Sequence, residues 1–226
     1  MHAVEGVGRW AGGAVFVGAL AFCGYSYVVV WARPVPFNRP AIALDALLFT
    51  AFAAHHSVFA REPVKRWLTH LVPERLVRSV YVWIASLLLI LVCAVWQPVG
   101  GDMYAVNGWR ALAHAAVQLG GVLIIASAVR AIDALELAGI RSHVAADSLQ
   151  IAGPYHWVRH PLYLGWLLAT LGPAHMTGDR LLFAGISAFY LIIAVPLEER
   201  SLGHSFGEDY ARYQRRVRWR MLPFVY

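Results

Sequence analysis

The chain has 226 residues, of which 59% are hydrophobic and only 14% are charged. Soluble domains carry roughly 25% charged residues, so this composition excludes an ordinary soluble protein. The net charge of +6 comes from 18 arginines and a single lysine, Lys65, and these charges fall between long apolar runs. We therefore read them as topology signals and contacts to anionic lipid, with no nucleic acid as partner, in an all-α, polytopic membrane protein.

Six apolar segments of about the length of a membrane span are expected along the chain. They cover residues 11–32, 41–60, 79–97, 110–130, 161–177 and 180–197. The fifth is short because Gly172-Pro173 interrupts it, which predicts a broken or shallow helix. Pro196 predicts that the sixth is kinked or ends just before Glu198.

The distribution of positive charge predicts the orientation. With six spans, 15 Lys and Arg residues fall on the side of both termini and four fall on the other side. Positive residues concentrate in cytoplasmic loops, so both termini are expected in the cytoplasm. The loop 131–160 and the tail 198–226 then face the same side, where a soluble cofactor could meet both.

The tail is expected to form an amphipathic helix at the cytoplasmic membrane surface. Apolar residues recur there at a helical spacing, with arginines on the opposite face. The apolar positions are Leu202, Phe206, Tyr210, Tyr213 and Val217. The loop 59–78 has a similar basic and aromatic composition and also suggests an interfacial helix.

The stretch 153–165 differs from an ordinary helix entry. Pro161 suits the first turn of a helix, so Arg159 and His160 should flank a helix N-terminus, which favours an anion. Gly165 leaves room for a ligand or a neighbouring helix. An alternative is that this basic, aromatic stretch only anchors a helix at the lipid headgroups.

Other polar residues lie in or next to the apolar segments. Glu198 and Glu199 follow the sixth segment, where a helix C-terminus would disfavour them unless a cationic or hydroxyl-rich ligand is bound. His56 lies in the second segment, and an ionisable residue in a span usually faces a cavity or a partner. Cys23 and Cys93 lie inside apolar runs, so neither a disulfide framework nor a metal site is expected.

Together these pieces resemble a known superfamily. The stretch Arg159-His160-Pro161 with Tyr163, the glutamate pair and the tail motif around Phe206-Gly207 are similar to the isoprenylcysteine carboxyl methyltransferases and phospholipid methyltransferases, which are integral-membrane enzymes. The stretches 56–61, 65–67, 78–81, 132–133 and 139–141 resemble the branch of bacterial methanethiol S-methyltransferases and NnrU-like proteins. The resemblance implies one methyltransferase domain, 1–226, with N-terminal helices in 1–109 and a cofactor-binding core in 110–226, in a bacterial inner membrane.

The resemblance also implies the cofactor, S-adenosylmethionine, held between the last helices and the cytoplasmic tail. Its expected binding residues are Leu149, Gln150, Tyr155, His160, Pro161, Leu162, Tyr163 and Glu198. A helix N-terminus with His160 suits the cofactor's carboxylate, aromatic rings suit its adenine, and Glu198 suits its ammonium or ribose hydroxyls.

One departure from the family pattern bears on the methyl acceptor. In the prenylcysteine enzymes an arginine precedes the glutamate by four residues and holds the substrate carboxylate, whereas this chain has Ala194 there. We therefore expect a small or lipophilic methyl acceptor, and a thiol fits this description best. We predict His56 and Arg141 as catalytic residues on the acceptor side, since a base or a cation favours the thiolate.

Three alternatives remain open from the sequence. Carboxyl or phospholipid methylation would keep the same fold and cofactor. A sterol-type reductase that uses NADPH has a related fold and a tail similar to residues 218–226, although the glutamate pair favours a methyltransferase. A non-enzymatic membrane protein would use the same polar residues only to anchor its helices.

Overall fold

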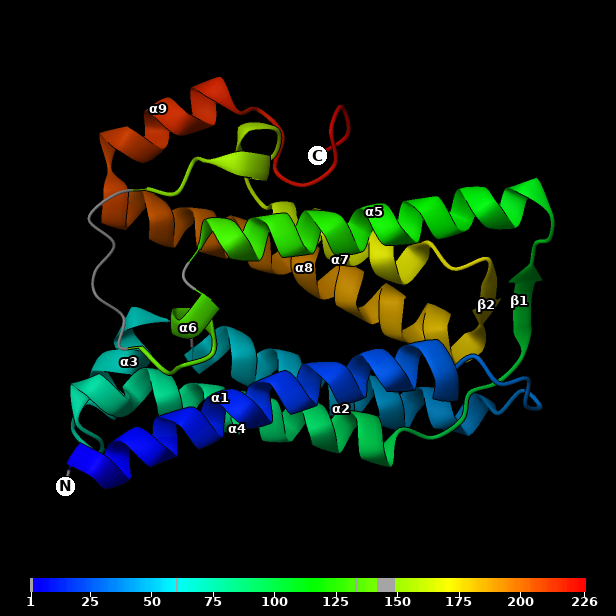
Figure 1. The fold of residues 1–226 in the computed structure, drawn as a ribbon, viewed down its shortest axis with the longest axis horizontal. Coiled ribbons are helices and arrows are strands. Elements are labelled where there is room, and N and C mark those ends of the chain that lie inside the picture. The colour runs from blue at the N-terminus through cyan, green and yellow to red at the C-terminus, as the bar shows by residue number, and fades with distance from the viewer. Residues whose placement is uncertain (1, 60, 133, 142–148) are drawn as a thin grey trace. The chain divides into compact units, whose positions relative to one another are not determined.

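A computed structural model describes residues 2–59, 61–132, 134–141 and 149–226 (Figure 1). The chain forms two compact units, Met1–Gly101 with Ala134–Ala145, and Asp102–Asp133 with Ala146–Tyr226. The helices of the first unit are α1 (His2–Tyr25, continued by a π-helical turn, Ser26–Val30), α2 (Arg39–Phe59), α3 (Glu62–Leu68), α4 (Glu74–Val95) and α6 (Ala134–Leu137). The second unit contains β1 (Asp102–Ala105), α5 (Trp109–Ala131), a 3-10 helix (Gly153–His156), α7 (Pro161–Leu171), β2 (His175–Thr177), α8 (Gly178–Phe206) and α9 (Glu208–Arg216).

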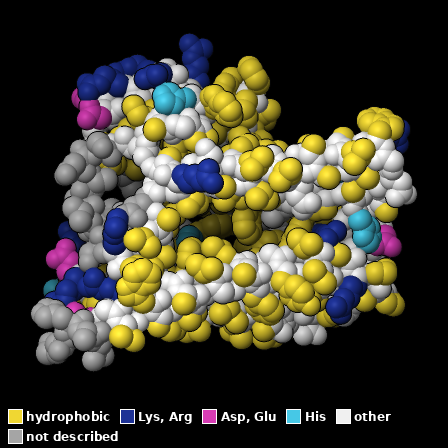
Figure 2. Space-filling view, in the orientation of Figure 1, with side chains coloured by type: hydrophobic (Ala, Val, Ile, Leu, Met, Phe, Trp, Pro, Cys, Tyr) yellow, Lys and Arg dark blue, Asp and Glu magenta, His cyan; other side chains and the backbone are white. Residues whose placement is uncertain are grey.

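The expected all-α membrane bundle is confirmed. Five helices among the described residues are long and apolar enough to cross a membrane, namely α1 with its π-helical turn, α2, α4, α5 and α8. Large apolar side chains cover the flank of α5, where Trp109, Leu112, Leu119 and Leu123 are exposed (Figure 2). An apolar surface of this kind is what a lipid environment requires of a helix.

The fifth of the six expected segments is interrupted at Gly172-Pro173 as predicted, whereas the sixth extends beyond its predicted end. The fifth, α7, ends at Leu171 before Gly172-Pro173, and its 11 residues reach only about 16 Å at the rise of an α-helix. The sixth does not end before Glu198, because α8 continues through Pro196 to Phe206. Glu198 and Glu199 therefore lie inside a helix rather than at its C-terminus.

The first unit is held by close packing of α1 and α2 on α4. Trp83 of α4 lies against Gly12, where a Cβ atom would come within 2.5 Å of the indole nitrogen. The same nitrogen donates a hydrogen bond to the carbonyl oxygen of Gly8, at 3.0 Å. Near the start of both helices, Arg75 of α4 pairs with Glu5 of α1 at 2.7 Å.

In the second unit, α5 and α7 pack with their backbones almost in contact. A Cβ atom on Gly121 would lie 2.6 Å from the carbonyl oxygen of Gly165, and one on Gly165 would lie 2.7 Å from that of Gly121. Small residues permit such close helix approach in membrane proteins. The predicted room around Gly165 is thus filled by a neighbouring helix.

A two-stranded antiparallel ladder joins the segment before α5 to the segment after α7. Strands β1 and β2 pair antiparallel, with Ala105 opposite His175 and Asp102 opposite Thr177. Thr177 also caps α8, since its hydroxyl accepts a hydrogen bond from the backbone N–H of Arg180 at 3.3 Å. This ladder is not part of the predicted architecture.

The tail forms two helices rather than one. Gly207 has a positive φ of 51° and separates α8 from α9. The five apolar positions predicted to share one face nevertheless pack together, because Tyr210, Tyr213 and Val217 form a buried cluster that Leu202 and Phe206 contact. The chain then turns back, and Met221 joins Leu167, Leu191 and Val195 in the core between α7 and α8.

Candidate functional site

The entry to α7 is fixed by the C-terminal segment. The backbone N–H groups of Arg159 and His160 donate hydrogen bonds to the carbonyl oxygens of Trp219 and Arg220, at 2.9 and 2.8 Å. His160 is the N-cap residue, with φ −124° and ψ 66°, and Pro161 follows at the first helical position, as predicted. The tail therefore determines where α7 begins and which way His160 points.

Three side chains meet between α7 and α8. The hydroxyl of Tyr163 donates a hydrogen bond to Oε2 of Glu198 at 2.7 Å, and Nδ1 of His160 lies 3.5 Å from the same oxygen. The rings of His160 and Tyr163 stack with their centroids 5.4 Å apart. The Glu198 side chain is 44% exposed, whereas that of His160 is 4% exposed. Glu198 is thus a carboxylate with a fixed orientation and access to a ligand.

Below this carboxylate lies a buried ion-pair network. Nε of Arg159 lies 2.6 Å from Oε1 of Glu199, and Nε of Arg220 lies 3.0 Å from the other oxygen. Arg159 also donates to the carbonyl oxygens of Val217 and Arg218, at 2.7 and 2.8 Å. The carboxylate of Glu199 is thus paired inside the protein and supports the site, while Glu198 is the more exposed of the two glutamates.

The environment of this cluster shifts the pKa of two groups outside the spanning helices. Burial opposes the charged form of His160, but the hydrogen bonds and negative charges of Glu198 and Glu199 outweigh it and raise the pKa. Burial and the charge of Glu198 raise the pKa of Tyr155 to about 12. His160 is therefore held as a partner of two carboxylates, and Tyr155 stays neutral beside them.

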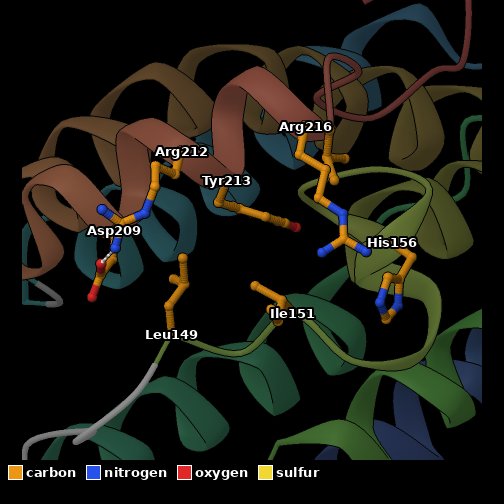
Figure 3. A pocket seen from close by; sticks show the side chains of 8 residues that line it. Leu149, Ile151, His156, Asp209, Arg212, Tyr213 and Arg216 are labelled. Carbon is orange, nitrogen blue, oxygen red and sulfur yellow. Dashed lines mark hydrogen bonds and ion pairs between the residues drawn. The ribbon is translucent and has the colours of Figure 1, made fainter.

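A cavity of 470 Å³ opens on the α9 side of this cluster (Figure 3). Leu149 and Ile151 line it from the loop before α7, His156 from the 3-10 helix, and Arg212, Tyr213 and Arg216 from α9. The Tyr213 hydroxyl donates to the carbonyl oxygen of Tyr155 at 2.8 Å, which joins the cavity wall to the cluster. This volume lies within the range of small-molecule and cofactor sites.

The structure brings most of the predicted cofactor residues to this region. Tyr155, His160, Pro161, Tyr163 and Glu198 surround the entry to α7, and Leu149 lines the cavity. The side chain of Gln150 is instead engaged with backbone, since it donates to Ala131 and accepts from the N–H of Ala152. Leu162 lies in the first turn of α7 and is partly buried.

The two predicted catalytic residues belong to the first unit. His56 lies in the last turn of α2, where its Nδ1 is 2.7 Å from the hydroxyl of Tyr81. Arg141 follows α6 and is exposed. The eight predicted cofactor residues all belong to the second unit.

Sequence reasoning gave no binding role to Arg220 or to the cavity residues other than Leu149, and it named Glu199 only as the neighbour of Glu198. A signal for Glu199 does exist, because Leu191, Val195 and Glu199 recur every four residues and are all buried. That stripe is visible only if α8 continues past Pro196. The cavity combines a loop, a 3-10 helix and a tail helix, and no local pattern marks such a combination.

Comparisons with known proteins identify the family. No family model and no solved structure matches the chain. A methanethiol S-methyltransferase of Bradyrhizobium diazoefficiens is 38% identical over 89% of this chain and 82% of its own length. Proteins of the same name from a Pseudomonas species and from Crocosphaera subtropica are 37% and 34% identical, over 78% and 82% of this chain and 72% and 76% of theirs. The chain therefore belongs to the methanethiol S-methyltransferase family of integral-membrane methyltransferases.

Proposed function

We propose that the protein transfers the methyl group of S-adenosylmethionine to the sulfur of a small thiol such as methanethiol. The relatives' names support methylation of such a thiol. The structural observation that carries the proposal is the Glu198 carboxylate, which Tyr163 orients beside His160 and which remains half exposed.

The donor groups around Glu198 fit the chemistry of this cofactor. A carboxylate suits the cofactor's ammonium or its ribose hydroxyls, because hydrogen bonds to a charged acceptor are strong. The rings of Tyr155 and Tyr163 flank the entry to α7 and suit adenine, and Leu149 adds an apolar surface in the adjoining cavity. Pro161 and Leu162 shape the first turn that these rings surround.

His160 acts in this proposal by holding Glu198. Its ring is almost fully buried and lies between two carboxylates, so a protonated His160 donates toward Glu198 rather than toward a ligand carboxylate. Gln150 acts similarly, because its hydrogen bonds to backbone fix the loop that carries Leu149. Both residues thus orient the groups that contact the cofactor.

The bound cofactor supplies a methyl group on a sulfonium, which is already a good leaving group. The protein then has to align the acceptor sulfur with that methyl group and to exclude water. A thiol also has to lose its proton, and thiolate is the reactive form.

For the acceptor side we propose His56 and Arg141. Nδ1 of His56 lies 2.7 Å from the Tyr81 hydroxyl, and when Nδ1–H donates to that oxygen, Nε2 is the acceptor that takes the thiol proton. Arg141 would favour the thiolate by its charge. Both assignments rest on residue chemistry.

The membrane orientation belongs to the same proposal. We place both termini on the cytoplasmic side of a bacterial inner membrane, where a water-soluble cofactor reaches the region between α7 and α9. Reporter fusions at either terminus test this placement, since alkaline phosphatase is active only outside the cytoplasm. An active fusion at the C-terminus would reverse the orientation.

The function is tested with purified protein in detergent. S-adenosylhomocysteine should bind in calorimetry and NADPH should not, and label should pass from methyl-labelled S-adenosylmethionine into volatile dimethyl sulfide when methanethiol is supplied. Glu198→Gln should weaken binding of S-adenosylhomocysteine about tenfold or more, whereas Glu208→Gln, a change at an exposed acid at the start of α9, should have no effect.

Two results would contradict the proposal. Binding of NADPH without binding of S-adenosylhomocysteine would favour a reductase. Label that appears in extracted lipid and not in the volatile product would assign a lipid acceptor.

A further inference from the structure

The charges that line the cavity beside α9 are not balanced. Arg212 forms an ion pair with Asp209 one turn earlier in the helix. Arg216 extends toward His156 across the cavity, with no acidic side chain drawn between them (Figure 3). Of the eight side chains that line the cavity, Asp209 is the one acid, and it is already paired.

His156 presents its outer nitrogen to the same space. Its Nδ1 donates to the carbonyl oxygen of Gly153 at 3.1 Å, so Nε2 is the nitrogen that remains for a ligand. The guanidinium of Arg216 extends into the same space and is a charged donor suited to an anion.

The cavity wall is connected to the Glu198 cluster by two hydrogen bonds. Tyr213 donates to the carbonyl oxygen of Tyr155, and Arg159 donates to that of Val217, another residue that lines the cavity. Arg159 in turn binds Glu199, the neighbour of Glu198. The cavity wall and the Glu198 cluster are thus parts of one hydrogen-bonded region of the second unit.

We infer that Arg216, in the cavity beside α9, binds the carboxylate of the cofactor's amino acid part. The inference rests on the proposed function and deepens it, since it assigns the one anionic group of the cofactor to a residue that the family resemblance did not indicate. Glu198 then takes the ribose hydroxyls or the ammonium. The assignment of the carboxylate to Arg216 also explains why His160, which lies between two glutamates, is not needed to bind it.

The test compares two ligands that differ only in this carboxylate. S-adenosylhomocysteine and its decarboxylated analogue are titrated into wild-type protein, Arg216→Gln and Arg215→Gln in the same detergent. Arg215 is the matched control, since it is an exposed neighbour on α9 that does not line the cavity. Arg216→Gln should lower the affinity for S-adenosylhomocysteine about tenfold and leave the affinity for the analogue unchanged. Arg215→Gln should change neither affinity.

Each other outcome is decisive. An equal loss for both ligands, or no loss for either, overturns the role of Arg216 at the carboxylate. If Arg216→Gln instead removes co-purifying anionic phospholipid and leaves both nucleoside affinities unchanged, the cavity is a headgroup site and the inference fails. If the wild-type protein binds neither nucleoside, the proposed function itself fails. The wild-type titration therefore separates this failure from a failure of the inference.

Discussion

Arg159 and Glu199 form an ion pair that is almost completely buried, with 2.6 Å between Nε and Oε1 and side chains only 7% and 6% exposed. The pair lies directly under the exposed Glu198. Arg159 also donates to two backbone carbonyls of the tail, so one guanidinium joins the entry of α7, the middle of α8 and the C-terminal segment. The positions of the site residues therefore depend on ion pairs that need not contact a ligand.

Removing one partner of this pair should destabilise the protein strongly. Arg159→Met leaves the Glu199 carboxylate with Arg220 and the His160 ring but without its shortest ion pair, and breaking a buried pair typically costs about 3–5 kcal/mol. We expect a lower unfolding midpoint in detergent for Arg159→Met and little change for Arg218→Met, because the Arg218 side chain is exposed. An unchanged midpoint in Arg159→Met would show that the pair is not structural.

The stability contributed by His160 should depend on pH. Its folded-state pKa is raised, so the native protein binds the proton more tightly than the unfolded chain does. This contribution is complete below the unfolded value of about 6.5 and is lost as the pH rises through the folded-state pKa.

The measurement compares the thermal midpoints of wild type and His160→Gln from pH 6 upward. The gap between the two proteins should be widest near pH 6 and should narrow as the pH increases. A gap that widens with pH would mean that His160 stabilises the fold as a neutral ring.

The close approach of α5 and α7 offers a prediction with an internal control. Gly121→Ala would place its Cβ 2.6 Å from backbone atoms of Gly165 and Ala169, whereas Gly120→Ala meets nothing within 4 Å. Overpacking of this kind costs about 1–3 kcal/mol, while alanine in an open helical position is neutral or favourable. Unfolding midpoints should therefore fall for Gly121→Ala only, and equal midpoints would contradict the observed packing.

Hydrophobic pattern predicted the long helices well because each is a continuous apolar run. The segment expected at 110–130 is α5, Trp109–Ala131, and that at 41–60 corresponds to α2, Arg39–Phe59. Runs of this length have few alternatives in a membrane, where every backbone group has to be hydrogen-bonded within its own helix.

Pro196 shows why the end of α8 was not predictable. A proline removes one backbone hydrogen bond and favours a kink or a break, and this local rule predicted a kink or an end before Glu198. The helix continues to Phe206 because Glu199 is anchored by Arg159 and Arg220, which lie 40 and 21 residues away in sequence. The distant partners of Glu199 are not visible in a local pattern, so the four-residue spacing of Leu191, Val195 and Glu199 was outweighed by the proline rule, and no local pattern marked the cavity beside α9.

The proposed acceptor base gives a kinetic prediction. If His56 accepts the thiol proton, His56→Ala should lower kcat about 100-fold or more at saturating thiol and leave the affinity for S-adenosylhomocysteine unchanged. The deficit should shrink at high pH, where the thiol ionises without help. A pH-independent deficit, or unchanged turnover, would remove His56 from the chemistry.

The orientation of Glu198 by Tyr163 can be isolated with two matched substitutions. Tyr163→Phe removes the 2.7 Å hydrogen bond to Glu198, and Tyr104→Phe removes a comparable 3.1 Å bond to the carbonyl oxygen of Pro173 next to the β1–β2 ladder. Each loss should cost stability on the order of 1 kcal/mol. Only Tyr163→Phe should also lower the affinity for S-adenosylhomocysteine, by roughly three- to tenfold. Without Tyr163 the Glu198 carboxylate can rotate, and fixing it on binding costs part of the binding free energy. Equal affinities in the two variants would mean that Glu198 does not depend on Tyr163 for its orientation, or does not meet the cofactor.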